Sequence, residues 1–328
     1  MKGWIIYRKD ITQLSPEAYE IHRLLSEAEV DGIKLEVFRP EQFDLIVTRE
    51  DEKSILINGE KHELPDFVMP RMGAGTTYFT LAILRQIERL GIYTINNSNS
   101  IEIVKDKLFS QQILAQNNLP VPKTMLAKFP VDVGLVERTL GFPVVVKTIS
   151  GSQGSGVFLA ETKRSFRDVM DLIESTNRNA NMIMQEFIAP SKGMDLRVFT
   201  LGGRAIACFR RRSGDGGFKA NFSSGGKVEP YKITPEIEWL ATQTSNILNL
   251  DMAGIDLLFD NDHFKICEAN SSPGFEGLES CCEDVNIPQE LFHFLRIRLG
   301  KFSEIEHPHP HHPTPPHPKA LQSQLTEG

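Results

Sequence analysis

A predicted β-hairpin over residues 254–269 constrains the fold more than any other feature of the sequence. Its two strands are apolar, yet Asp256, Glu268 and Asn270 interrupt them, and acidic and amide residues are depleted in strands. Glu268 and Asn270 are two residues apart and therefore point to the same face. If Asp256 pairs with Glu268, the three side chains converge. A register one residue shorter would pair Asp256 with Cys267 and turn Glu268 away.

Two carboxylates and one amide oxygen, without Cys or His, form a hard-oxygen set that suits Mg²⁺ or Mn²⁺. Such sites are usually completed by substrate phosphates and water. The alternative is that the three residues form a solvated face of the hairpin. We predict a metal site at Asp256, Glu268 and Asn270.

The chain has 328 residues, enough for two domains or three small ones. The first third has an α/β pattern, and the next two segments combine strands and helices as α+β units. We predict an N-terminal α/β domain over residues 1–98, α+β lobes over 99–190 and 191–300, and a tail over 301–328. The predicted strands are 4–7, 45–48, 66–69, 124–127, 143–148, 157–161, 182–188, 195–200, 205–211, 254–259 and 264–269. The predicted helices are 76–90 before Gly91, 101–116, one that ends at Gly141, one from Lys163, and one from Pro235 with Thr234 as N-cap.

A lysine ends the buried apolar strand before Thr148, and a glycine-rich loop follows at residues 151–156. Backbone N–H groups of such loops can cradle an anion. The loop lacks the Gly-Lys-Ser/Thr ending of a Walker A motif and the G-x-G-x-x-G order, so the phosphate lysine would be Lys147 on the strand. The alternative is a simple hairpin turn between Thr148 and Val157.

Two further segments have the composition of ligand-binding elements. Residues 185–188 end a strand and could form a hinge that offers backbone groups to an adenine edge, or could be a core strand that leads into a loop. Residues 210–221 concentrate Arg, Lys and Gly, which suits a loop that closes on a carboxylate or phosphate, although a solvated charge run is the usual explanation.

The composition excludes several classes of function. A net charge of -7 argues against nucleic-acid binding through general electrostatics. No apolar stretch approaches a membrane span, and the N-terminus lacks the apolar region of a signal peptide, so we expect a cytoplasmic protein that does not act on a membrane. The four cysteines form no C-x-x-C pair and are interpreted as reduced thiols.

The end of the chain is rich in His and Pro between residues 307 and 318. This composition is typical of an unstructured accessory segment. The alternative is a metal-handling tail.

In their order along the chain, these motifs resemble the ATP-grasp superfamily, and within it the RimK-type glutamate ligases. The most specific matches are residues 267–279, CEANSSPGFEGLE, which are similar to the family's E-x-N-x-S-P-G-x-E-G signature, and residues 253–256, AGID. Residues 69–73, MPRMG, and 105–107, KDK, are also similar. The resemblance covers residues 1 to about 295 and implies an ATP-grasp fold, with a pre-ATP-grasp domain and a nucleotide site between two α+β lobes.

The resemblance also implies roles for individual residues. The ATP phosphates would be contacted by two lysines and the glycine-rich loop, namely Lys107, Lys147, Gly151, Gln153, Gly154, Ser155 and Gly156. The adenine would be contacted by Glu186, Phe187 and Ile188, and the ribose side by Asp195. Lys219 and Asn221 would lie at the phosphate and substrate end. Asp256, Glu268 and Asn270 would bind two Mg²⁺ or Mn²⁺ ions. The substrate would be held by Arg71, Arg211, Arg212 and Asn221. The catalytic candidates are Arg211, Arg212, Lys219 and Asn221. Arg210 stands where an acidic residue often precedes the Arg pair, and Phe187 replaces a frequent Tyr.

The implied activity is an ATP-dependent carboxylate–amine ligase that works through an acyl phosphate. It would add glutamate or a similar amino acid to a peptide or protein C-terminus or to a small acid, in a homodimer or homotetramer. The alternative is an ATP-binding regulatory module that does not turn over. The intact set of lysines and metal ligands favours the enzyme.

Overall fold

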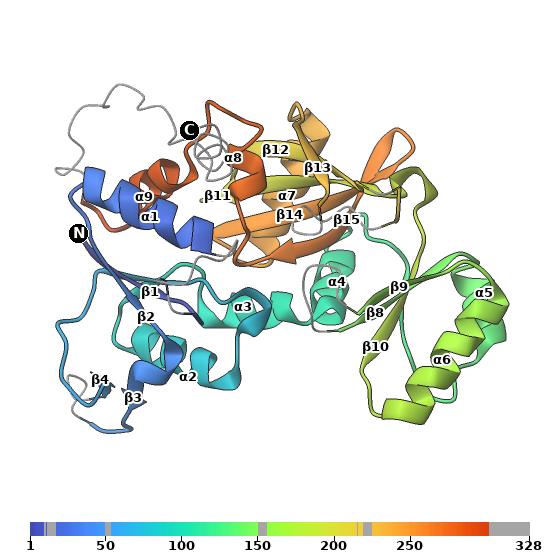
Figure 1. The fold of residues 1–328 in the computed structure, drawn as a ribbon, viewed down its shortest axis with the longest axis horizontal. Coiled ribbons are helices and arrows are strands. Elements are labelled where there is room, and N and C mark those ends of the chain that lie inside the picture. Colours follow the sequence, from blue (N-terminus) through green and yellow to red (C-terminus); the bar gives the residue numbers. More distant parts are fainter. Residues whose placement is uncertain are drawn as a thin grey trace, which may run out of the picture.

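The described part of the chain forms three lobes, each with its own β-sheet (Figure 1). The computed structural model describes residues 1–9, 11, 18–49, 54–149, 156–214, 216–218 and 225–301. Among these residues, no helix is both long and apolar enough to cross a membrane. Several predicted features lie outside the described residues, namely Gly151, Gln153, Gly154, Ser155, Lys219, Asn221 and the tail beyond Lys301.

The N-terminal lobe contains a parallel sheet with the strand order β2-β1-β5-β6. Strands β1 and β5 are apolar runs because both faces of a parallel sheet are covered, and Trp4 and Phe67 are fully buried. Helix α2 begins after Thr77, whose Oγ1 accepts a hydrogen bond from Thr80 N, and the φ of 77° at Gly91 confirms the predicted stop. The bounds are β1 Lys2–Ile6, α1 Tyr19–Val30, β2 Lys34–Phe38, β5 Phe67–Pro70, α2 Tyr78–Arg89 and β6 Tyr93–Thr94.

The predicted strand over residues 45–48 is wrong. The strand here is β3, Phe43–Leu45, and it pairs with β4, Ile55–Ile57, at the edge of the lobe. Ile46 and Val47 are apolar, as the predicted strand requires, but Val47 is fully exposed. The predicted strand was therefore misplaced, because apolar residues in this segment are not all buried.

The central lobe is an antiparallel sheet with the order β7-β10-β8-β9, and it projects to one side of the molecule with α5 and α6 (Figure 1). Val144, Val146 and Met184 pack against Phe166 of α6 in its core. The predicted strands are confirmed, with β10 ending at Glu186 rather than residue 188. The bounds are β7 Thr124–Leu126, α5 Val133–Thr139, β8 Val144–Thr148, β9 Val157–Ala160, α6 Lys163–Asn177 and β10 Met182–Glu186.

The single helix predicted over residues 101–116 is wrong, because Asp106 divides it. The Asp106 backbone is extended, and its carboxylate accepts hydrogen bonds from Leu108 N and Phe109 N, so it ends α3 (Ser98–Lys105) and caps α4 (Lys107–Gln116). Lys107 is therefore the first residue of a new helix. Leu114 of α4 packs in the core of the third sheet, so the helix spans the gap between the central and C-terminal lobes.

The C-terminal lobe is an antiparallel sheet with the order β13-β12-β11-β14-β15. One face packs under α7, whose predicted N-cap Thr234 is confirmed by the hydrogen bond from Ile237 N. Gly202 and Gly203 have φ values of 56° and 76°, as the tight β11–β12 turn requires. The bounds are β11 Met194–Leu201, β12 Arg204–Arg212, β13 Lys227–Pro230, α7 Pro235–Ile247, β14 Met252–Asp260, β15 His263–Asn270, α8 Glu276–Glu279 and α9 Ile287–Arg298.

The N-terminal and C-terminal lobes share one hydrophobic core and are joined by buried ion pairs. Glu279 accepts hydrogen bonds from Arg23 Nε at 3.0 Å and Tyr19 Oη at 2.8 Å, and its side chain is only 1% exposed. Arg71 Nη2 donates to the carbonyl of Pro273 at 2.7 Å. These contacts tie α1 and β5 to the segment that follows β15.

The Arg23–Glu279 pair gives a stability prediction. Glu279→Ala leaves the Arg23 guanidinium buried without its main counter-charge, so the free energy of unfolding should fall by about 3 kcal/mol. Urea unfolding followed by circular dichroism measures the change. The control is Glu290→Ala, whose pair with Arg204 is 4.0 Å long and exposed and should contribute less than about 1 kcal/mol. Equal midpoints for the two variants would contradict the prediction.

Candidate active site

The predicted hairpin register is confirmed where the polar side chains lie. Asp256 pairs with Glu268, and Gly254 pairs with Asn270. Nearer the turn, however, Leu257 pairs with Ile266, which is the shorter register. A β-bulge at Cys267 joins the two registers, and without it Glu268 would face away from Asp256.

Two arginines hold the carboxylate of Asp256. Arg197 donates from Nε to Oδ1 and from Nη2 to Oδ2, both at 2.7 Å, and Arg211 Nη2 donates to Oδ2 at 2.8 Å. Asp256 is only 3% exposed. Burial alone would raise the pKa of Asp256, but the two guanidinium groups lower it to about 2. The carboxylate is therefore ionised and fixed in orientation.

Arg211 also binds Asp195, the residue predicted near the ribose. Its Nε and Nη2 lie 2.6 and 2.8 Å from the Asp195 carboxylate oxygens. The two carboxylates raise the pKa of Arg211 against the effect of burial, while burial and the nearby Asp256 raise the pKa of Asp195 despite Arg211. The four side chains form a neutral chain, Asp195, Arg211, Asp256 and Arg197, on the face of the sheet opposite α7.

The other predicted metal ligands lie beside this chain. Glu268 is about a third exposed, and its Oε2 lies 3.9 Å from Lys107 Nζ. Asn270 Nδ2 donates to the carbonyl of Gly254, which leaves its oxygen as the atom for a cation. In the described part of the chain, no three His, Cys, Asp or Glu side chains could enclose an ion by themselves. A cation bound here would therefore need donors beyond these carboxylates, such as an amide oxygen and phosphate oxygens.

Lys147, at the end of β8, points across from the central lobe to β15. Its Nζ donates to Gln185 Oε1 at 2.7 Å and lies 3.6 Å from Cys267 Sγ. This lysine therefore reaches from the central lobe to the bulge of β15, one residue before Glu268 in the sequence. Burial raises the pKa of Cys267 to about 11, which keeps the thiol protonated.

Glu186 connects the same two lobes at the predicted hinge. Its Oε1 accepts from Lys123 N at 2.9 Å and from Lys265 Nζ of β15 at 2.7 Å. Burial would raise the pKa of Glu186, but these two donors lower it below the ordinary value. Phe187 is half-buried and Ile188 is buried, so an apolar strand end follows the ion pair.

The structure separates the predicted substrate arginines. Arg211 is buried against Asp195 and Asp256, whereas Arg212 is half-exposed and pairs with Glu229 at 2.9 Å, because successive side chains of a strand point to opposite faces. Arg71 is 8% exposed, next to Phe275 and the backbone of Pro273.

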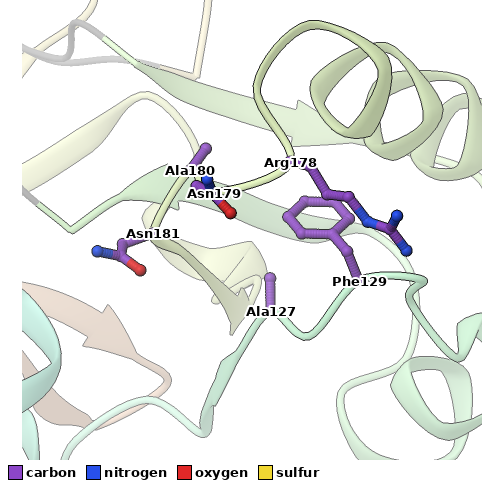
Figure 2. A pocket seen from close by; sticks show the side chains of 6 residues that line it. All are labelled: Ala127, Phe129, Arg178, Asn179, Ala180 and Asn181. Carbon is purple, nitrogen blue, oxygen red and sulfur yellow. The ribbon is translucent and has the colours of Figure 1, made fainter.

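One hollow in the described residues lies away from this site. Its volume is about 520 Å³, and Figure 2 shows Phe129 and Arg178 side by side on its wall, with Asn181 pointing away from them. A smaller hollow of about 310 Å³ is lined by Arg212 and by residues 227–229. Neither contains Lys147, Asp256 or Glu268.

Sequence reasoning missed the roles of Arg197, Gln185 and Lys265, although Gln185 lies in the predicted hinge over residues 185–188. A signal for Arg197 was present, because Asp195 and Arg197 alternate with the fully buried Leu196 and Val198 and so share one face of β11. Gln185 and Lys265 gave no such signal. Lys147, the partner of Gln185, lies on the neighbouring strand of the same sheet, whereas Glu186, the partner of Lys265, lies on another lobe.

The fold is that of the ATP-grasp ligases. The ATP-grasp ligase PsnB, complexed with a minimal precursor, superposes with a TM-score of 0.70 at 19% identity, over 91% of this chain and 98% of PsnB. The D-alanine–D-alanine ligase from Bacillus anthracis gives a TM-score of 0.64 at 16% identity, over 93% of this chain and 98% of that one. These likenesses confirm the predicted fold class.

Sequence relatives define the family. The model of the RimK-like ATP-grasp domain matches residues 104–295, and that of the RimK PreATP-grasp domain matches residues 10–101. A probable alpha-L-glutamate ligase of Legionella pneumophila (strain Corby) is 34% identical over 294 residues, which cover 89% of this chain and 96% of the relative. A probable alpha-L-glutamate ligase 2 of Shewanella sp. (strain W3-18-1) is 36% identical over 296 residues, 90% of this chain and 97% of the relative. The chain belongs to the RimK-like ATP-grasp family.

The lowered pKa of Glu186 predicts how the contact between the lobes depends on pH. A carboxyl group whose pKa is lowered by folding stabilises the folded state at pH values above its pKa in the unfolded chain. This stabilisation is lost as the pH falls through its pKa in the folded protein. Wild type should therefore be more stable than Glu186→Gln near neutral pH, and the difference should shrink below the ordinary value of 4.5. Thermal midpoints of both proteins from pH 7 to pH 3 test this, and a constant difference would contradict it.

Proposed function

We propose that this chain joins glutamate to a carboxylate acceptor through an amide bond, with hydrolysis of ATP to ADP. As a RimK-like ATP-grasp protein, it is an ATP-dependent ligase that forms C–N bonds. The observation that carries the assignment to this site is the pairing of Asp256 with Glu268, beside which Lys107 and Lys147 extend from two other elements.

The chemistry requires activation of a carboxylate. A free carboxylate is a poor electrophile, so the γ-phosphoryl group of ATP is first transferred to it, which gives an acyl phosphate and ADP. The amine then attacks the acyl carbon, and inorganic phosphate leaves. This sequence needs no covalent enzyme nucleophile. Catalysis therefore rests on positioning the reactants and on neutralising the charge that develops on the phosphoryl oxygens.

The residues divide this work between the lobes. Lys147 and Lys107 bind phosphate oxygens, residues 186–188 form the adenine side, and Asp195 lies toward the ribose through its pair with Arg211. Asp256, Glu268 and Asn270 would hold two Mg²⁺ or Mn²⁺ ions, which when bound offset the negative charge of the phosphates. The predicted loop residues 151–156, with Lys219 and Asn221, would cover the reactants and exclude water.

The substrates are inferred from relatives. The sequence relatives are probable alpha-L-glutamate ligases, which supports glutamate as the added amino acid. PsnB and the macrocyclase MdnC are complexed with precursor peptides, which supports a peptide as the acceptor. A protein C-terminus or a small acid would offer the same carboxylate. Arg71 and Arg212 would hold the substrate carboxylates, whereas Arg211 is already paired with Asp195 and Asp256. We also propose a cytoplasmic homodimer or homotetramer.

The test is product analysis by mass spectrometry, with ATP, Mg²⁺, glutamate and a pool of acceptor peptides and small acids. Wild type should form glutamylated products together with ADP. Glu268→Gln should reduce product formation by about a hundredfold or more, because it removes a carboxylate that would hold the divalent cation. The matched control is Asp262→Asn, an exposed change in the turn of the same hairpin, and it should keep wild-type activity.

Two outcomes would contradict the proposal. Full activity of Glu268→Gln at every Mg²⁺ concentration would show that the metal site is elsewhere. Tight binding of ATP by wild type, without product from any acceptor, would instead support an ATP-binding regulatory module.

A further inference from the structure

We infer that Gln185 is a positioning residue for Lys147, and that a hydrogen-bond relay through Thr124 fixes its orientation. This inference rests on the proposed role of Lys147 at the ATP phosphates. Gln185 is only 2% exposed, lies in the interior strand β10 and carries both a donor and an acceptor. A buried amide of this kind requires partners for both groups.

The hydrogen bonds of the relay can run in only one direction. The carbonyl oxygen of Pro122 can only accept, and Thr124 Oγ1 donates to it at 2.9 Å. Because the hydroxyl proton of Thr124 is used there, its oxygen accepts from Gln185 Nε2 at 3.0 Å. The carbonyl oxygen of Gln185 is thereby directed to the other side, where Lys147 Nζ donates to it at 2.7 Å.

The relay limits where the ammonium group of Lys147 can lie. Lys147 and Gln185 share one face of the sheet, since Lys147 pairs with Ile183, two residues before Gln185. An ammonium group has three protons. One is directed to Gln185 and the second toward Cys267 Sγ at 3.6 Å, so the third is available for an anion between β8 and β15.

The base of the relay is anchored to the opposite lobe. Pro122 belongs to the segment between α4 and β7, and in the same segment the carbonyl of Pro120 accepts from Ile266 N of β15 at 2.8 Å. The position of Lys147 is therefore set relative to the strand that carries Glu268. A flexible lysine would have to lose its side-chain freedom when ATP binds, whereas one held by Gln185 is already placed.

The experiment compares the binding of ATP with that of adenosine, in the presence of Mg²⁺ and without an acceptor. Gln185→Leu should weaken ATP binding by about tenfold to a hundredfold, because a charged hydrogen bond is lost. Adenosine, which has no phosphate, should bind as it does to wild type. Competition against a fluorescent adenine nucleotide measures both affinities.

Thr124 gives a second test that avoids a change at Gln185. Thr124→Val should weaken ATP binding in the same direction but by less, and Thr124→Ser should restore it because the hydroxyl is kept. The control is Thr244→Val in α7, which removes a buried hydroxyl that donates to Leu240 O at 2.7 Å, away from the site. It should leave both affinities unchanged.

A double-mutant cycle separates positioning from a general structural effect. In a Lys147→Met background, Gln185→Leu should cause little further loss of ATP affinity, since there is no ammonium group left to place. The inference is overturned if Gln185→Leu and Thr124→Val bind ATP like wild type, if they lose adenosine as strongly as ATP, or if the losses simply add. Failure of the proposed function would look different: wild type would bind ATP normally but form no amide product.

Discussion

The site depends on one buried interaction, the double ion pair of Asp256 with Arg197 and Arg211. Burial of a single carboxylate would be very unfavourable, and it is possible here because Asp195, Arg211, Asp256 and Arg197 alternate in charge and sum to zero. The four side chains come from three adjacent strands, β11, β12 and β14, so their pairing also fixes the register between those strands. The opposite face of the same strands is apolar and packs under α7. One sheet thus supports a hydrophobic core on one face and a charged site on the other.

The second requirement is that the central lobe keep its place relative to β15. Lys147 and Glu186 both reach that strand, one beside Cys267 and the other through Lys265, and the segment before β7 bonds to Ile266. These contacts are few and polar, and no shared hydrophobic core joins the central lobe to the rest in the described residues. By contrast, the N-terminal and C-terminal lobes share a core and the buried Arg23–Glu279 pair. The central lobe is therefore held against β15 by polar contacts, whereas the other two lobes are held together by a shared core.

Much of the site could be predicted from the sequence because it depends on local rules. Alternation along strands placed Glu268 and Asn270 on one face, and Thr234 and Gly91 marked helix ends correctly. Where such rules compete, the prediction failed. Asp106 is of a residue type that often caps a helix, but it lies inside a sequence pattern typical of one continuous helix. In the structure it caps a helix, so the segment forms α3 and α4 instead of the single predicted helix. The hairpin combines both registers that the sequence allowed, because the tight turn at Asn261 sets one and the bulge at Cys267 introduces the other.

The sequence by itself determined the α/β and α+β character of the segments, the strand faces and the hard-oxygen set, since these follow from residue type and spacing along the chain. The ATP-grasp fold was implied by the resemblance of its motifs to that superfamily. Only the tertiary structure decided which charges meet: Arg211 lies between two carboxylates rather than free for a substrate, while Arg212, its neighbour in sequence, lies on the other face. It likewise decided that Gln185 holds Lys147. The physical reason is that an ion pair or a buried amide bonds to the group that lies at the right distance and orientation. These are set by which strands pair and in which register, between residues far apart in the sequence, and no local pattern records them.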